Sequence, residues 1–82
     1  MKPYPIDVDG MIRTIEKRLE ELAEQQNLSG EEEEGRMLAD SYLRGFLAMF
    51  YSLKQQGITE TDSSKVDLRR LMMSMGMKWR GS

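Results

Sequence analysis

The segment Met37–Leu53 reads MLADSYLRGFLAMFYSL and decides the fold of this chain. It holds both phenylalanines and two of the three tyrosines, while Asp40 and Arg44 are its only charged residues. No other segment of the sequence is apolar over so wide an arc at 3.6 residues per turn. We therefore expect the core to be built against this segment, which predicts an architecture but no chemistry.

A long helix is predicted around this segment, from a capping box at Ser29 and Glu32 to a stop at Gly57. Its large apolar residues form two seams, one of Leu38, Tyr42, Met49 and Leu53 and the other of Ala39, Leu43, Phe46 and Phe50. Because one partner helix cannot cover both seams, at least two neighbouring elements are expected. The glutamates Glu31–Glu34 are interpreted as first-turn residues that complement the helix dipole, in preference to an acidic binding patch.

The same helix carries a stripe of small residues on a side away from the seams. Ser41, Gly45, Ala48 and Ser52 are spaced four, three and four residues apart, so they share one face. Glycine inside a helix costs about 1 kcal/mol relative to alanine, and close approach of a second helix would compensate for that cost. Small polar residues that simply face water are the alternative interpretation. We predict a homodimer with Ser41, Gly45, Ala48 and Ser52 at its interface.

A first, amphipathic helix is predicted over residues 11–26. Its apolar residues Ile12, Ile15, Leu19 and Leu22 recur every three or four positions, which is typical of a helix buried on one side. Two prolines favour an extended lead-in over residues 1–9, after which Asp7 or Asp9 can cap the helix. The short connection Asn27–Gly30 predicts an antiparallel hairpin with the long helix.

A shorter third helix is predicted after the polar connector Ile58–Asp62, with Ser63 or Ser64 as its cap. Its main apolar stripe is Leu68, Leu71, Met72 and Met75, and a weaker second stripe is Val66, Met73 and Met77. The expected fold is therefore all-α, a small helical bundle in which the third helix packs near the end of the second. We expect residues 1–82 to form a single domain, with residues 78–82 as a flexible basic tail.

Composition argues against several classes of function. The chain has no cysteine and no histidine, so it lacks thiolate ligands, the commonest general base and the commonest transition-metal ligand. No segment reaches the roughly 20 apolar residues of a membrane span, and the N-terminus lacks the apolar run of a signal peptide. We therefore expect a cytoplasmic protein that is not an enzyme and that binds no cofactor, metal or membrane.

A partial calcium-binding motif lies near the N-terminus. Asp7, Asp9, Gly10, Ile12 and Glu16 stand where an EF-hand loop has its third, fifth, sixth, eighth and twelfth residues. Pro5 occupies the first ligand position and has no side-chain oxygen, and there is no room for an entering helix before it. We interpret these carboxylates as helix-capping and surface residues rather than as calcium ligands.

Positive charge is concentrated towards the C-terminus. Residues 63–82 contain five basic residues and one acidic residue, a balance of +4, whereas residues 1–62 contain seven basic and thirteen acidic residues, a balance of −6. Two methionines lie off the main apolar stripe beside arginines, and an apolar strip with a positive edge is suited to docking. The predicted partner-binding residues are Arg69, Arg70, Met73, Met77 and Trp79.

The predicted function is that of a non-catalytic regulator or adaptor, which acts as a homodimer through contacts with another protein. One alternative is a small DNA-binding transcriptional regulator whose basic third helix contacts phosphates while Trp79 stacks on a base. Another is a structural subunit of a larger assembly. Protein contacts are favoured over nucleic acid because the short third helix, with two apolar stripes, leaves little polar surface to enter a groove.

Overall fold

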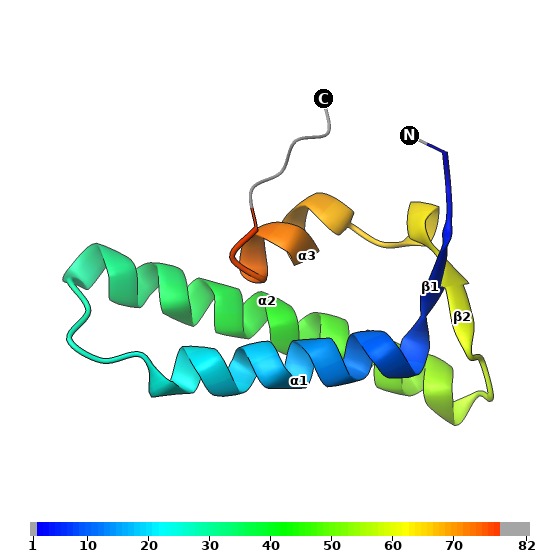
Figure 1. Ribbon diagram of the computed structural model, residues 1–82, viewed down its shortest axis with the longest axis horizontal. Helices are drawn as coiled ribbons and strands as arrows, with labels where there is room; N and C mark the ends of the chain where they lie inside the picture. Colours follow the sequence, from blue (N-terminus) through cyan, green and yellow to red (C-terminus); the bar gives the residue numbers. More distant parts are fainter. Residues whose placement is uncertain (1, 78–82) are drawn as a thin grey trace.

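The computed structural model describes residues 2–77, which form two long helices, a small sheet and a short third helix (Figure 1). The elements in chain order are β1 (Pro5–Asp7), α1 (Val8–Glu24), α2 (Gly30–Gln55), β2 (Glu60–Asp62), a 3₁₀ turn (Ser63–Lys65) and α3 (Leu68–Ser74). The mostly helical fold with three helices agrees with the prediction, and the sheet is what the all-α expectation missed. Trp79 and the expected basic tail, residues 78–82, lie outside the described residues.

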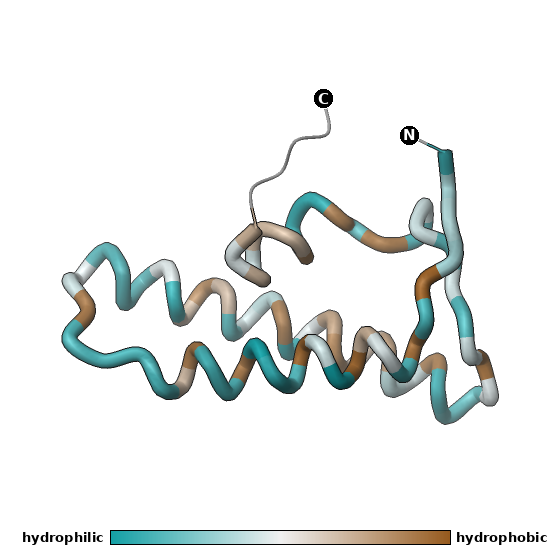
Figure 2. Tube along the Cα trace, viewed as in Figure 1, coloured by the Kyte–Doolittle hydropathy of each residue, from teal (hydrophilic) through white to brown (hydrophobic). Residues whose placement is uncertain are grey.

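The core lies mainly between α1 and α2, which run side by side in opposite directions (Figure 1). Ile15 of α1 and Leu43 and Phe50 of α2 are fully buried, and Ile12 and Leu22 extend this core along α1. Hydrophobic positions recur along both helices (Figure 2). The apolar stripe predicted for the first helix and the second seam predicted for the long helix therefore do form the core.

The predicted helix boundaries are largely confirmed by hydrogen bonds. The Asp7 carboxylate accepts from the Gly10 N–H at 2.8 Å and caps α1, which therefore begins at Val8, three residues before the predicted start. Ser29 and Glu32 form a reciprocal capping box at the start of α2, with distances of 3.2 and 3.0 Å. After α2 ends, Gly57 turns the chain with a φ of +78°. Local side-chain chemistry thus sets where both long helices begin.

The sheet joins the two segments that were expected to be an extended lead-in and a polar connector. β1 pairs antiparallel with β2, and Ile6 lies opposite Thr61. Beside this pair, the Tyr4 N–H donates to the hydroxyl of Ser63 at 2.9 Å, and Ser63 is buried. Ser63 therefore does not cap the third helix, because its side chain is committed to the N-terminal strand.

The third helix begins later than predicted. Asp67 is its N-cap and accepts from the Arg70 N–H at 3.2 Å. The main stripe is confirmed in most of its members, since Leu71 is buried and Leu68 and Met75 pack against the core, whereas Met72 is half-buried. The second stripe divides, because Val66 is buried whereas Met73 and Met77 are exposed. The third helix was predicted to pack near the end of α2, but the sheet and the 3₁₀ turn follow that end. Instead α3 lies beside residues 35–42, in the first half of α2.

Candidate functional site

Two hollows flank α3, one on each side. The first, here called the α2–α3 hollow, has a volume of about 570 Å³ and is lined by Gly35, Leu38, Ala39 and Tyr42 of α2 with Asp67, Arg69, Arg70, Met73 and Ser74. The second, here called the α1–α3 hollow, has a volume of about 390 Å³ and lies between α3, the start of α1 and β1. Because α3 separates them, these hollows offer two distinct surfaces.

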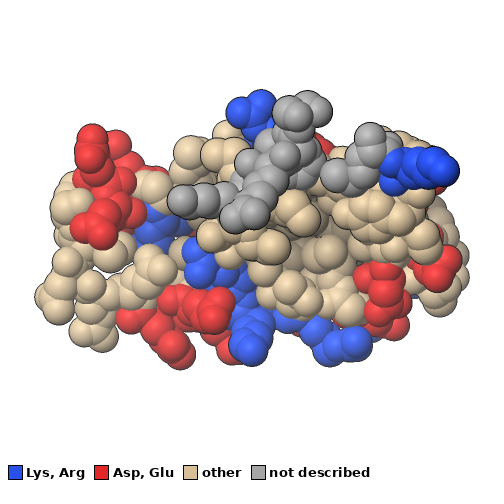
Figure 3. All heavy atoms as spheres, turned by 45° about the horizontal axis from the view of Figure 1, so that its top comes forward, with Lys and Arg blue, Asp and Glu red and all other residues tan. Residues whose placement is uncertain are grey.

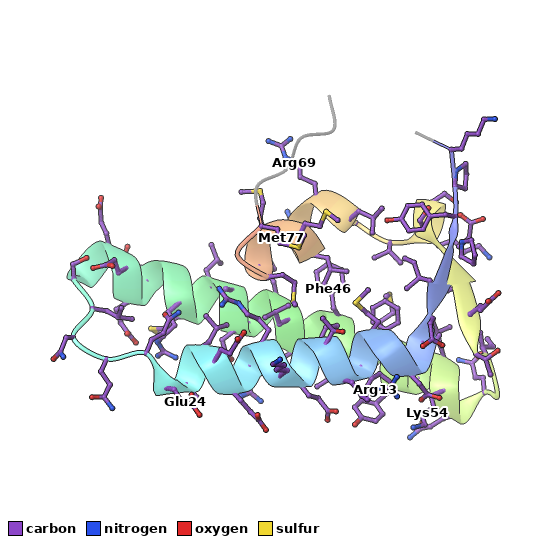
Figure 4. All side chains as sticks on the ribbon, viewed as in Figure 1. Arg13, Glu24, Phe46, Lys54, Arg69 and Met77 are labelled. Carbon is purple, nitrogen blue, oxygen red and sulfur yellow. The ribbon has the colours of Figure 1, made fainter. Side chains whose placement is uncertain are left out.

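The α2–α3 hollow has an apolar floor and a basic edge. Leu38 is 55% exposed and Met73 is 59% exposed, so both present large apolar surfaces to solvent. The Arg70 guanidinium lies 4.7 Å from the centre of the Tyr42 ring, a cation–π arrangement. Arg69 points away from the helical hairpin (Figure 4) and makes no ion pair among residues 2–77. This hollow can therefore accept an apolar side chain flanked by a negative charge.

The α1–α3 hollow is lined almost entirely by uncharged side chains. Four methionines contribute to it, together with tyrosine, proline, isoleucine, threonine and leucine side chains and the backbone of one glycine; the methionines are Met11, Met72, Met75 and Met77. Asp7 is the only charged residue in its lining, and its carboxylate already caps α1. Methionine side chains are unbranched and polarisable, so such a surface adapts to apolar groups of different shape.

The structure divides the predicted partner-binding set between the two hollows. Arg69, Arg70 and Met73 line the α2–α3 hollow together, whereas Met77 lines the α1–α3 hollow. Trp79 lies outside the described residues. Sequence reasoning missed the exposure of Leu38, because the same helical period that identifies the buried Leu43 also assigns Leu38 to a seam. It also missed Met11 as a lining residue, since its place in the first helix indicated only a core position.

The four residues of the predicted dimer interface share one exposed side of α2. Ser41, Gly45, Ala48 and Ser52 are all exposed to solvent. A side chain added at Gly45 would meet no atom within 4 Å, so this side of α2 is open there. Within the described part of the chain nothing covers the stripe, and its role at a dimer interface remains a prediction.

The carboxylates of the partial calcium motif are all engaged with neighbouring groups. Asp7 caps α1, Asp9 pairs with the Lys54 ammonium at 3.0 Å, and Glu16 accepts from the Tyr51 hydroxyl at 2.9 Å. The bond to Glu16 stabilises the phenol form and raises the pKa of Tyr51, and the contact with Asp9 raises the pKa of Lys54. These contacts join α1 to the last turns of α2, and the capping interpretation of Asp7 is confirmed.

Two other kinds of site are absent from the same residues. Between residues 2 and 77, no group of three or more acidic side chains is arranged to hold a metal ion. Over that range, no helix has both the length and the apolar character needed to cross a membrane. No protein-family model matches the chain, and no curated protein and no solved structure matches it either. The two hollows beside α3 are therefore the candidate binding surfaces.

Proposed function

We propose that this protein is a non-catalytic regulator or adaptor that binds another protein through the α1–α3 hollow. The supporting observation is the lining of that hollow, where four methionines surround an open, nearly uncharged concavity. Concave apolar surfaces of this kind bind partners, because covering them removes apolar area from water. The partner chemistry that fits is an amphipathic segment which inserts uncharged apolar side chains between α1 and α3.

The way α3 is attached suits this role. It has only seven residues, and Leu71 is its one buried apolar side chain. A long hydrogen bond of 3.4 Å from the Arg18 guanidinium to the Ser74 carbonyl joins its last turn to α1. A short helix with a single buried apolar side chain can shift slightly as the methionines repack around a bound side chain.

A pair of matched substitutions tests this proposal. Met77→Glu places a charge in the hollow, whereas Met37→Glu places one at a similarly exposed position of α2 that lines neither hollow. After capture from the native host and identification by mass spectrometry, the affinity of the purified partner is measured for each variant. We expect Met77→Glu to weaken binding at least tenfold and Met37→Glu to leave it unchanged. Equal loss in both variants, or no loss in either, would contradict the proposal.

We further propose that the protein works as a homodimer. The exposed side of α2 supports this, because large apolar and small residues lie there without a covering element within residues 2–77. Burial of such a face is the usual gain from self-association in a small domain. A subunit role in a larger assembly would use the same face.

The DNA-binding alternative has weaker support. On this side of the described chain Lys65, Arg69 and Arg70 are the basic side chains that can meet phosphates, and Arg70 also stacks on Tyr42. Binding that rests on phosphate contacts falls steeply with salt. Fluorescence anisotropy with a labelled duplex at low and at physiological ionic strength therefore tests this alternative, and salt-sensitive binding that Arg69→Ala weakens would favour it.

A further inference from the structure

We propose that a second copy of this chain occupies the α2–α3 hollow, with the two α2 helices packed antiparallel about a two-fold axis at Leu38. This inference rests on the proposed homodimer and names its interface. The centre of the dimer contact is then the exposed apolar floor of the hollow, in place of the small-residue stripe.

The apolar part of the interface centres on Leu38. This residue belongs to the same seam as Met49 and Leu53, yet those two pack against the core whereas Leu38 is 55% exposed. Met73 lies in the same hollow and is 59% exposed. Beside them Gly35 leaves open space, since a side chain added there would meet no atom within 4 Å. A second α2 can therefore approach closely and cover both large side chains.

The charged groups on the Leu38 face of α2 favour a second copy of this chain as the occupant. Glu34 lies four residues before Leu38 and Tyr42 lies four residues after it, so all three project from one side of the helix. In a two-fold antiparallel pair centred on Leu38, Glu34 of one copy lies beside Tyr42 of the other. Since the Arg70 guanidinium stacks on Tyr42, each copy places a carboxylate next to the other copy's guanidinium.

Both partners of this pair have free capacity. Glu34 makes no ion pair within residues 2–77, and the ion pair of Arg70 with Asp67 is long, at 3.9 Å. Acidic groups gather at the end of the molecule where α2 begins (Figure 3). A surface that carries both signs around one apolar centre is self-complementary, as a two-fold interface requires. A surface that binds nucleic acid would not carry Glu31–Glu34 here, because carboxylates repel phosphates.

The test is a charge exchange between two copies of the full chain. Glu34→Arg alone and Arg70→Glu alone each place two like-charged pairs in the proposed homodimer. We expect each variant to self-associate at least tenfold more weakly than the natural chain, by light scattering across a concentration series at low salt. A mixture of the two variants restores both pairs, so native mass spectrometry with one variant isotopically labelled should detect mainly the heterodimer.

Matched controls keep folding and non-specific charge effects apart from the interface. Glu20→Arg and Arg13→Glu change exposed charges on α1, away from the α2–α3 hollow, and should leave self-association unchanged. Far-UV circular dichroism should show the same helicity for every variant. Helicity loss in Arg70→Glu is addressed by Glu34→Arg, because that change lies in an exposed turn and still predicts the loss of the dimer.

Each other outcome overturns the inference in a distinguishable way. A natural chain that stays monomeric at all concentrations contradicts both the homodimer and this interface, and leaves the α1–α3 hollow to be judged by the Met77 test. A dimer that resists both charge changes but is broken by Ala48→Arg and Ser52→Arg keeps the homodimer and returns the interface to the small-residue stripe. Those positions lie roughly 15 and 21 Å along the helix from Leu38, outside the proposed contact. A monomer whose hollow binds an acidic amphipathic peptide at Arg70 assigns that hollow to another partner.

Discussion

The two ends of the helical hairpin differ in how many sides of α2 are covered. At the end where α1 begins, here called the closed end, α1 covers one side of α2, and the sheet lies beside its last turns (Figure 1). At the end where α2 begins, here called the open end, α1 still buries Leu22, but Leu38 and Met37 face solvent. The same helix is therefore enclosed at one end and available at the other.

This difference shows that non-helical segments complete the core. Ile6 of β1 and Val8 at the start of α1 are buried together with Val66, which follows the 3₁₀ turn. On the outside, Asp9 and Glu16 of α1 contact Lys54 and Tyr51 of α2. No comparable contact between α1 and α2 lies at the open end within residues 2–77. The exposed apolar surface of α2 therefore lies at the open end, which the strands do not cover.

The largest effect expected is the loss of stability from a core substitution at the closed end. Phe50 is fully buried, so Phe50→Ala should lower the free energy of unfolding by about 3–5 kcal/mol. Leu38→Ala removes a residue of the same helix that is 55% exposed, and the change should stay within about 0.5 kcal/mol. Urea unfolding followed by circular dichroism measures both values.

Two results would contradict this ordering. Similar losses at Phe50 and Leu38 in dilute protein would mean that the open end is covered in the monomer. If Phe50→Ala does not fold, Phe50→Leu keeps the test usable, because it retains most of the apolar volume and should cost less. A larger loss at Leu38 only at high protein concentration would sharpen the comparison, since it would locate that residue at a dimer contact.

The helices were predictable because their signals are local. Apolar spacing identified Ile15 and Phe50, and the capping box at Ser29 identified the start of α2, whereas Asp7 was one of two candidate caps and α1 was expected to begin three residues late. The strands were not predictable, because three-residue strands carry too few positions for a period of two, and their pairing joins segments more than fifty residues apart. Ser63 shows the consequence. A serine before a helix suggests a cap, but the Ser63 hydroxyl instead accepts from the N–H of Tyr4, just before the distant strand β1.

The candidate site was predictable only in part. An apolar strip beside arginines correctly indicated that Arg70 and Met73 share a surface, because both lie on one short helix. Which residues face them across the hollow depends on where α3 packs, and that packing rests on contacts distant in sequence, such as those of the buried Leu71 with the core. Exposure of Leu38 follows from that placement, so no local pattern distinguishes it from Met49.

Loss of the strand attachment at the closed end should have a moderate effect. Ser63→Ala removes the acceptor of the Tyr4 N–H and leaves that donor without its partner. We expect unfolding to become easier by about 1–2 kcal/mol. Hydrogen exchange should quicken for the amide of Tyr4 and for the strand amides beside it, while amides at the start of α2 keep their rates. Equally faster hydrogen exchange along the whole chain would show that the strand pairing does not open separately from the rest of the fold.

Glycine substitutions contrast the closed end with the exposed side of α2. Gly57→Ala forces an L-residue into a φ of +78° and should destabilise the fold by about 1 kcal/mol. Gly45→Ala meets no atom within 4 Å and removes a weak helix former, so it should stabilise the fold by about 0.5–1 kcal/mol. Thermal unfolding of both variants gives the two signs. Destabilisation by Gly45→Ala at high protein concentration alone would indicate close helix packing at the small-residue stripe.

The smallest effect is expected at the open end, where the capping box holds the start of α2. Ser29→Ala removes one of its two hydrogen bonds at an exposed helix start and should cost about 0.5 kcal/mol.

The Ser29 N–H donates to the Glu32 carboxylate and lowers the pKa of Glu32 below its ordinary value of 4.5. A carboxyl group whose pKa is lower in the folded state stabilises that state above its ordinary pKa, and the contribution disappears as the pH falls through the lower value. Glu32→Gln keeps an acceptor but no titrating group, so its unfolding midpoint should fall below that of the natural chain at neutral pH and converge with it as the pH falls through the lowered pKa of Glu32. Midpoints that remain equally separated down to about pH 3 would contradict the assignment.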